Sequence, residues 1–202
     1  MTPGKRLFDI LLALTLLLPG VVLMLLIAVA ILVVDGGPVF YRSERMRDAD
    51  RAFGLLKFRT MRPDDGDHGV TGGDKAARVT RTGRVLRAAR LDELPQLWNI
   101  LSGDMSFVGP RPPLRRYVED RPELYRAVLR SRPGLTGLAT LIFRAYEERL
   151  LAACDTAAET DRVYRERCVP KKARLDLLYQ RKQSFLYDIA ILRRTIRAII
   201  YR

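Results

Sequence analysis

The sequence predicts a predominantly helical α+β protein with a membrane anchor at its N-terminal end. Residues 10–34 form a run of 25 residues without a charge, which exceeds the roughly 20 apolar residues that a bilayer-spanning helix needs. Helical patterns dominate the rest of the chain, and strand-like patterns are restricted to residues 39–41 and 53–61. At 202 residues and without an internal linker or repeat, the chain fits one folded domain after the anchor. We therefore divide it into an anchor, residues 1–36, and a domain, residues 37–202.

The composition is strongly basic and poor in the residues of metal and redox chemistry. Lysine and arginine number 36 against 23 acidic residues, which gives a net charge of +13. Such a field attracts nucleic acid, anionic lipid or phosphorylated small molecules. A nucleic-acid binder would not explain the apolar run, so we expect no nucleic-acid partner. The two cysteines lack the spacing of zinc ligands, and the single histidine, His68, lies in a Gly/Asp-rich loop.

The apolar run has three interpretations. A cleaved signal peptide would begin at Lys5 and Arg6, but the run is long for one. A spanning helix is the ordinary interpretation, yet Pro19 lies near the middle of the run. The two halves would each be only about 18 to 21 Å long, whereas the hydrocarbon core is roughly 30 Å thick. Basic residues flank both ends, so the positive-inside rule places both ends in the cytoplasm. The residues alone favour equally a kinked spanning helix and a re-entrant helix–break–helix, in which the chain enters and leaves the same leaflet.

Several helices are expected after the strands. One runs over residues 82–90, and the next starts near Asp92, with Pro95 tolerated in its first turn. Its predicted buried stripe consists of Leu94, Leu97, Trp98 and Leu101. Residues 147–173 are charged and helical without an evident site. Residues 184–201 form a basic amphipathic helix, which fits an anionic membrane surface and equally fits packing against the domain.

A pair of adjacent carboxylates in the centre of the chain is the main candidate for chemistry. Asp92 and Glu93 lie in the segment LDELPQLWN, residues 91–99. An aspartate at a helix N-terminus is kept ionised by the helix dipole, and an ionised carboxylate can attack phosphorus. Glu93 can share a Mg²⁺ ion, which prefers oxygen ligands and phosphate partners. In isolation the pair would be read as an ordinary helix cap.

The cations around this pair favour a phosphate site over a cap. Lys57 and Arg59 are predicted on one face of the second strand, and Arg87 lies in the predicted helix before the carboxylates. Arg111 lies in the Gly/Pro-rich segment of residues 103–112. Guanidinium groups bind phosphate oxygens through paired hydrogen bonds. Together these side chains predict a cradle for a diphosphate close to a membrane.

Several motifs along the whole chain point to one family. They occupy residues 5–9, 37–40, 56–61, 91–97, 103–112, 133–137 and 188–195. With these motifs the chain resembles the bacterial sugar transferases, monotopic phosphoglycosyl transferases that start glycan assembly on polyprenyl phosphate. The resemblance is to the minimal form of the family, without the additional N-terminal spans of larger members.

The resemblance implies a reaction and roles for the residues. A UDP-sugar would donate its sugar-1-phosphate to undecaprenyl phosphate and release UMP. Asp92 would be the nucleophile of a covalent phosphosugar intermediate, and Glu93 would assist with Mg²⁺. Arg87, Arg111 and Arg144 match active-site arginines of the family. The resemblance also implies a re-entrant anchor among the membrane lipids, with the catalytic domain on the cytoplasmic face of the bacterial inner membrane.

Departures from the family pattern leave the sugar open. Residues 141–144 read LIFR, where many members carry a different polar run, and Leu18 stands before Pro19 where serine is common. The resemblance therefore does not carry over the identity of the sugar. Two other functions fit the residues: a membrane-tethered hydrolase, which would release UMP without the lipid, and a non-catalytic basic adaptor, which would not need Asp92.

Overall fold

The computed structural model describes residues 1–62, 70 and 72–201, and in this part the fold is predominantly helical. The helices are α1 (Pro3–Val34), α2 (Arg81–Ala89), α3 (Gln96–Ser102), α4 (Arg115–Asp120), α5 (Pro122–Val128), α6 (Leu138–Ala152), α7 (Ala157–Val163), α8 (Val169–Lys182) and α9 (Phe185–Ile200). Two short 3-10 helices, η1 (Gly73–Arg78) and η2 (Leu91–Glu93), and one π-helical segment, η3 (Tyr164–Cys168), lie between them. Strands β1 (Phe40–Met46) and β2 (Ala52–Phe58) form one sheet, and β3 (Ser106–Val108) and β4 (Gly134–Thr136) another. The predicted predominantly helical α+β class is confirmed.

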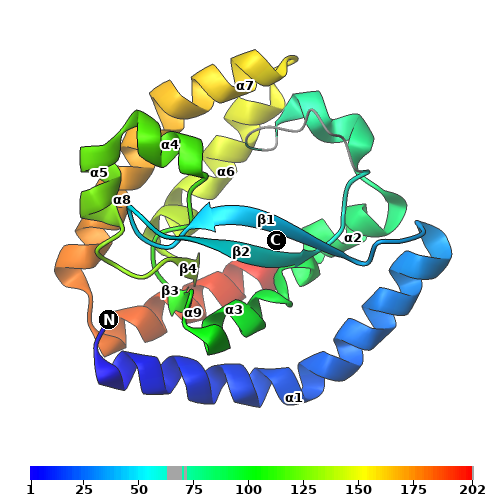
Figure 1. The fold of residues 1–202 in the computed structure, drawn as a ribbon, viewed down its shortest axis with the longest axis horizontal. Helices are drawn as coiled ribbons and strands as arrows, with labels where there is room; N and C mark the ends of the chain where they lie inside the picture. Colours follow the sequence, from blue (N-terminus) through cyan, green and yellow to red (C-terminus); the bar gives the residue numbers. More distant parts are fainter. Residues whose placement is uncertain (63–69, 71, 202) are drawn as a thin grey trace.

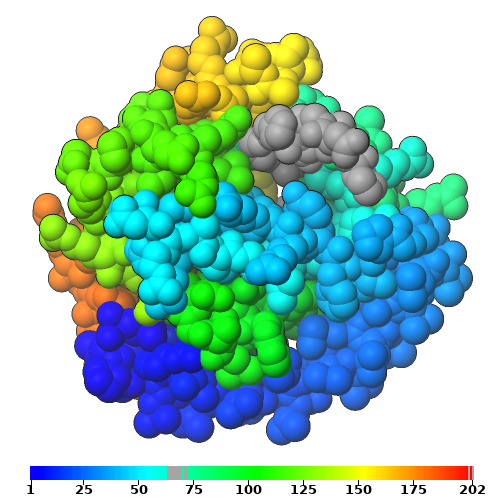
Figure 2. All heavy atoms as spheres, in the orientation of Figure 1, coloured from blue at the N-terminus to red at the C-terminus, as the bar shows by residue number. Residues whose placement is uncertain are grey.

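The apolar run forms one continuous helix that bends. Helix α1 starts at an N-cap, Thr2, whose hydroxyl accepts a hydrogen bond from the backbone of Lys5 at 3.3 Å. It continues through Pro19 and bends near its middle, and it follows the lower and right edges of the molecule (Figures 1 and 2). Proline removes one backbone hydrogen bond and crowds the preceding turn, which bends a helix without ending it. By length and composition α1 can cross a membrane, although only 17% of its most apolar window is buried.

Both ends of α1 are fixed to the rest of the fold. Near the N-terminal end, Lys5 forms a buried ion pair with Asp188 of α9. Arg6 donates to two carbonyls at the C-terminal end of α3, at 2.5 and 2.7 Å, where a cation complements the helix dipole. At the other end, Thr82 of α2 donates its hydroxyl and its backbone N–H to the carboxylate of Asp35. Between these ends the inward face of the helix packs on the domain, where Ala13, Ile27 and Ile31 are buried.

The antiparallel hairpin β1–β2 covers α3 and supplies part of the core. Its register pairs Phe40 with Phe58 and Met46 with Ala52. Phe53 and Leu55 alternate with more exposed residues along β2 and belong to the same buried cluster as Ile100 of α3. Alternation of this kind is typical of a strand with one face on the core. Both strands lie near their predicted positions, β1 extending further than expected.

The short parallel pair β3–β4 was not predicted, and its glycines explain how it forms. A Cβ on Gly109 would lie 2.1 Å from the carbonyl oxygen of Arg132. A Cβ on Gly134 or Gly137 would lie 2.1 Å from a backbone atom of Gly109. Only glycine permits such a close approach of two backbones. The contact fixes the turn that begins at Pro110, whose carbonyl accepts from Gly134 N–H at 2.8 Å.

One predicted buried stripe is corrected by the structure, and one amphipathic helix is placed by it. The stripe predicted to bury Trp98 is wrong at that residue, which is 62% exposed, whereas Leu97 and Ile100 are buried. Helix α3 has only seven residues, so it presents one narrow face to the core. In α9, the helix expected to be amphipathic, Ile191 is 2% exposed whereas Ile196 is 55% exposed. Part of its apolar face therefore points away from the domain.

The Lys5–Asp188 pair should carry a measurable part of the stability. Its side chains are 9% and 5% exposed, and removing one partner of a buried pair typically costs about 3–5 kcal/mol. Lys5→Met should therefore lower the midpoint of thermal unfolding in detergent. The exposed pair of Arg126 and Glu123, with side chains 58% and 84% exposed, provides the control, since Arg126→Met should cost less than about 1 kcal/mol. Equal shifts for the two variants would show that the buried pair stabilises the fold no more than the exposed one does.

Candidate active site

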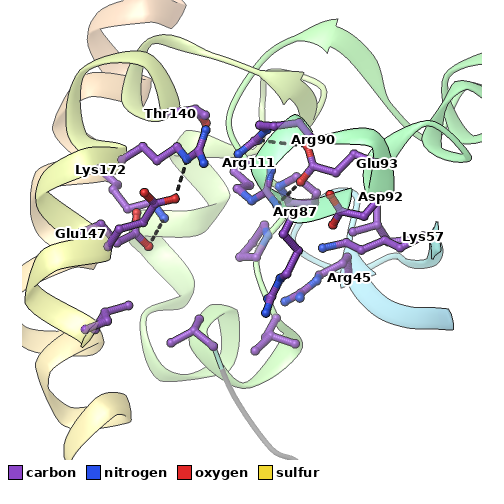
Figure 3. A pocket seen from close by; sticks show the side chains of 18 of the residues that line it. Arg45, Lys57, Arg87, Arg90, Asp92, Glu93, Arg111, Thr140, Glu147 and Lys172 are labelled. Carbon is purple, nitrogen blue, oxygen red and sulfur yellow. Dashed lines mark hydrogen bonds and ion pairs between the residues drawn. The ribbon is translucent and has the colours of Figure 1, made fainter. Parts of the chain in front are cut away.

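A cavity of about 560 Å³ brings together most of the predicted site residues. Side chains from β2, α2, η2, the turn after β3, α6 and α8 line it, as Figure 3 shows. The predicted residues on its walls are Lys57, Arg87, Asp92, Glu93, Arg111 and Arg144. Segments that are far apart in the sequence thus meet around the carboxylate pair.

An unusual backbone conformation presents the carboxylates to the cavity. Helix α2 ends at Arg90, whose φ of 58° and ψ of 21° are left-handed, a conformation uncommon for residues other than glycine. The chain reverses there and enters the 3-10 turn η2, which contains Asp92 and Glu93. The next α-helix, α3, starts at Gln96 and not near Asp92 as predicted. The helix dipole therefore contributes less at Asp92 than the sequence suggested, and neighbouring charges dominate.

Glu93 is ionised and already paired. It is 7% exposed, and its two oxygens accept from Arg111 at 2.6 Å and from Arg90 at 3.0 Å. Burial opposes its ionisation, but Arg111, Arg90 and Lys57 outweigh burial and lower the pKa of Glu93 to about 2. In return, Glu93 raises the pKa of Arg111. Glu93 thus joins the end of α2 to the turn after β3.

Asp92 differs from its neighbour because its carboxylate lacks such partners. Within residues 1–62, 70 and 72–201, no hydrogen bond to its side chain is formed. Burial and the adjacent Glu93 raise the pKa of Asp92, while Lys57, Arg87 and Arg90 oppose the increase. Figure 3 shows its carboxylate beside Glu93 and Lys57 at the cavity wall. A half-buried carboxylate without a hydrogen-bond donor is suited to act as a nucleophile.

The cations on this wall are crowded and favour an anionic ligand. Burial and the charge of Arg111 lower the pKa of Lys57 to about 8, although Glu93 opposes them. Burial and Arg111 likewise lower the pKa of Arg45 to about 10. A phosphate placed among these groups would relieve their mutual repulsion.

Arg45 and Arg90 line the cavity but were not predicted as site residues from the sequence. Arg45 lies in β1, where no motif marks it, and it reaches the cavity only because β1 pairs with β2. The contact of Arg90 with Glu93 could have been predicted, because Arg90 precedes Glu93 by three residues. Side chains of opposite charge at this spacing meet on a helical turn.

The opposite wall of the cavity is polar and balanced in charge. Lys172 of α8 donates to Glu147 of α6 at 2.9 Å and to the Tyr164 hydroxyl at 3.3 Å. Arg144 donates to Glu148 at 2.6 Å. Figure 3 shows Glu147 and Lys172 across the cavity from Asp92. Of the residues on this wall, only Arg144 was predicted. The others come from the charged segment of residues 147–173, in which no motif marks a site.

Arg59, predicted to bind the substrate, does not line the cavity. It is 7% exposed, and its guanidinium donates to the carbonyls of Asp35 at 3.0 Å, Gly37 at 2.7 Å and Gly36. The chain leaves β2 after Phe58, so the alternation that would have placed Arg59 on the face of Lys57 no longer applies. Arg59 therefore fixes the turn between α1 and β1. His68 lies outside the described residues.

The side chains of the cavity could bind a magnesium ion only together with the phosphate of a bound substrate. Among the described residues no group of three or more His, Cys, Asp or Glu side chains could hold a metal ion. Magnesium is commonly bound by one or two carboxylates together with substrate phosphates and water. Asp92 meets this requirement, whereas Glu93 would have to exchange an arginine for the ion. The pair fits Mg²⁺ in combination with a bound phosphate.

The sequence matches the family described as bacterial sugar transferase over residues 2–202. The chain belongs to this family. A UDP-N-acetylgalactosamine-undecaprenyl-phosphate N-acetylgalactosaminephosphotransferase of Aeromonas hydrophila is 37% identical over 184 residues, 88% of this chain and 39% of the relative. A UDP-glucose:undecaprenyl-phosphate glucose-1-phosphate transferase of Caulobacter vibrioides is 45% identical over 139 residues, 67% of this chain and 52% of the relative.

Another relative has a more similar length. An uncharacterized sugar transferase of Bacillus subtilis, EpsL, is 36% identical over 196 residues, 97% of this chain and 87% of the relative. The chain spans about half the length, or less, of the Aeromonas and Caulobacter relatives. The relatives named by a reaction are transferases of sugar phosphates to undecaprenyl phosphate.

The lowered pKa of Lys57 predicts a pH-dependent affinity for phosphate-bearing ligands, for which UMP serves as a probe. Lys57 is cationic below its pKa of about 8 and neutral above it, and a phosphate binds the cation. Affinity should therefore be highest near pH 7.5 and fall several-fold by pH 9 in isothermal titration calorimetry. Lys57→Arg stays charged over this range and should show a much smaller decrease. An equal decrease in both proteins would contradict the assignment.

Proposed function

We propose that this protein transfers a sugar-1-phosphate from a UDP-sugar to undecaprenyl phosphate and releases UMP. The observation that carries the proposal is the Asp92 carboxylate, which has no hydrogen-bond donor among the described residues and lies in a cavity rich in cations. The names of the relatives support the donor and acceptor classes. The product would be the lipid-linked sugar with which assembly of a membrane glycan begins.

The residues suggest a reaction in two displacements. Lys57, Arg87 and Arg111 bind the diphosphate of the donor, and Asp92 attacks the phosphorus that carries the sugar. The bond from this phosphorus to the UMP oxygen breaks, which leaves a phosphosugar on Asp92. A phosphate oxygen of undecaprenyl phosphate then attacks the same phosphorus and releases the carboxylate. One phosphoanhydride is broken and one is formed, so no separate energy source is needed.

Glu93 has two roles in this scheme. Its hydrogen bonds to Arg90 and Arg111 hold both guanidinium groups at the cavity wall, and its own negative charge discourages the neutral form of these arginines. Magnesium held by Asp92 and donor phosphate oxygens, and by Glu93 once it exchanges one of its arginines for the ion, would supply additional neutralisation of the phosphate charge.

The polar wall opposite Asp92 suits the sugar of the donor. Sugar hydroxyls both donate and accept hydrogen bonds, and the pairs Lys172–Glu147 and Arg144–Glu148 offer both kinds of group without a net charge. The sugar would therefore lie between Asp92 and helices α6 and α8. This placement gives Arg144 its substrate-binding role.

We also propose that α1 is a re-entrant anchor in the inner membrane and that residues 37–202 lie on its cytoplasmic face. Lys5 and Asp35, near the two ends of α1, both contact the same domain, so the two ends lie on one side of the bilayer. Between them the helix exposes large apolar side chains, including Leu18, Leu25 and Val33, which lipid tails would cover. The flanking basic residues favour the cytoplasmic side.

Helix α9 would extend this membrane contact. Its N-terminal Phe185 packs edge-on against Phe8 of α1 with ring centroids 5.2 Å apart. Leu186 and Ile196 are exposed, and Arg193 and Arg194 are available for anionic headgroups. Of the two interpretations of this helix, the exposed apolar side chains favour the membrane surface.

The proposal predicts that UMP release depends on both the lipid and Asp92. Purified protein in nanodiscs with Mg²⁺ should release UMP from at least one UDP-sugar only when undecaprenyl phosphate is present, and Asp92→Asn should reduce turnover by at least about a thousandfold. Glu123→Gln, an exposed acid on α5, should leave turnover unchanged.

Other outcomes would identify another function. Sustained UMP release without the lipid would indicate a hydrolase. Full function of Asp92→Asn in membranes would indicate a non-catalytic adaptor, and either result would contradict the proposed transfer.

A further inference from the structure

A buried amide without a hydrogen-bond partner lies one helical turn after Asp92. Gln96, the first residue of α3, is 1% exposed and lines the cavity. Its Nε2 is buried and donates no hydrogen bond. An unpaired buried donor is costly for a folded protein, so each one that a native structure retains calls for an explanation, and a catalytic role is one such explanation.

The neighbouring Asp92 has the complementary deficiency. Its carboxylate accepts no hydrogen bond from any described residue, while the adjacent Glu93 accepts two. Leu94 and Pro95 between Asp92 and Gln96 have helical backbone angles, with φ and ψ of −51° and −40° and of −62° and −16°. Asp92 and Gln96 are therefore four residues apart on continuous helical turns, and both line the cavity. A donor without an acceptor and an acceptor without a donor thus border the same cavity.

The unpaired state of Gln96 is not a general property of the amides on this helix. Asn99, three residues further along α3, is also buried at 4% exposure. Its Oδ1 accepts from Leu56 N–H at 3.0 Å, and its Nδ2 donates to the Gly54 carbonyl at 2.9 Å. Asn99 therefore fastens α3 to β2, whereas Gln96 contributes no such link.

We propose that Gln96 is a positioning residue that donates a hydrogen bond from Nε2 to one carboxylate oxygen of Asp92 once the donor is bound. This bond would fix the rotation of the carboxylate and leave its other oxygen directed at the phosphorus. Hydrogen bonds of catalytic groups are often absent or long in ligand-free enzymes and tighten in the complex. Glu93 cannot take this part, because it is an acceptor whose oxygens are engaged by Arg90 and Arg111. The inference rests on the proposed transfer reaction.

The test compares Gln96→Met with Asn99→Leu in the full-length protein. Both replace a buried amide by an apolar side chain of similar length, and for each we would measure the midpoint of thermal unfolding and the steady-state kinetics of UMP release. Gln96→Met should keep or raise the unfolding midpoint, since an unpaired donor is removed. It should lower kcat by about tenfold to a hundredfold and leave KM for the UDP-sugar nearly unchanged. Asn99→Leu should lower the midpoint, because two hydrogen bonds are lost.

Several results would overturn the inference. A lower unfolding midpoint for Gln96→Met, similar to that of Asn99→Leu, would make Gln96 a structural residue. A raised KM with unchanged kcat would mean that Gln96 contacts the donor and not Asp92. If the wild-type protein is active and Gln96→Met is equally active, this inference is overturned while the proposed function stands. Wild-type protein without turnover on any UDP-sugar would overturn the proposed function and this inference with it.

Discussion

The site depends on one buried carboxylate that accepts hydrogen bonds from two arginines. Glu93 binds Arg90, which stands in a left-handed conformation at the end of α2, and Arg111, which comes from the turn after β3. Each of these charges would be costly to bury alone, and the three together compensate one another. Because Glu93 is engaged in this way, we propose Asp92 as the carboxylate of the pair that reacts. The proposed division of roles rests on the surroundings of the two residues and not on their sequence order.

The remainder of the fold supports this arrangement from two sides. The close backbone contact between Gly109 and Gly134 fixes the turn that carries Arg111. On the other side, Arg6 of α1 binds the end of α3, directly after the segment that carries the carboxylates. The apolar helix and the site are therefore parts of one packed unit. Such rigidity would place the nucleophile at a constant depth relative to the membrane, where the phosphate of a polyprenyl lipid is found.

Local patterns predicted the elements better than the contacts between them. The helix before the carboxylates, the first two strands and the bend at Pro19 follow from short-range rules of capping, alternation and proline geometry. The parallel pair β3–β4 could not be predicted, because it depends on contacts between distant glycines. Arg59 was misplaced because the strand ends one residue before it. Trp98 was misplaced because a helix with two turns has a single buried face, and Glu147 and Lys172 reach the cavity only through the packing of α6 against α8.

The proposed mechanism requires that Asp92 becomes covalently attached to the sugar phosphate. Mass spectrometry of the full-length protein can detect this adduct after incubation with Mg²⁺ and a UDP-sugar in the absence of undecaprenyl phosphate. We expect a mass increase equal to one sugar phosphate, located on the peptide that contains Asp92, and its loss when undecaprenyl phosphate is added. A protein that turns over with the lipid but never carries this adduct would contradict the covalent role of Asp92 and indicate direct transfer from donor to lipid.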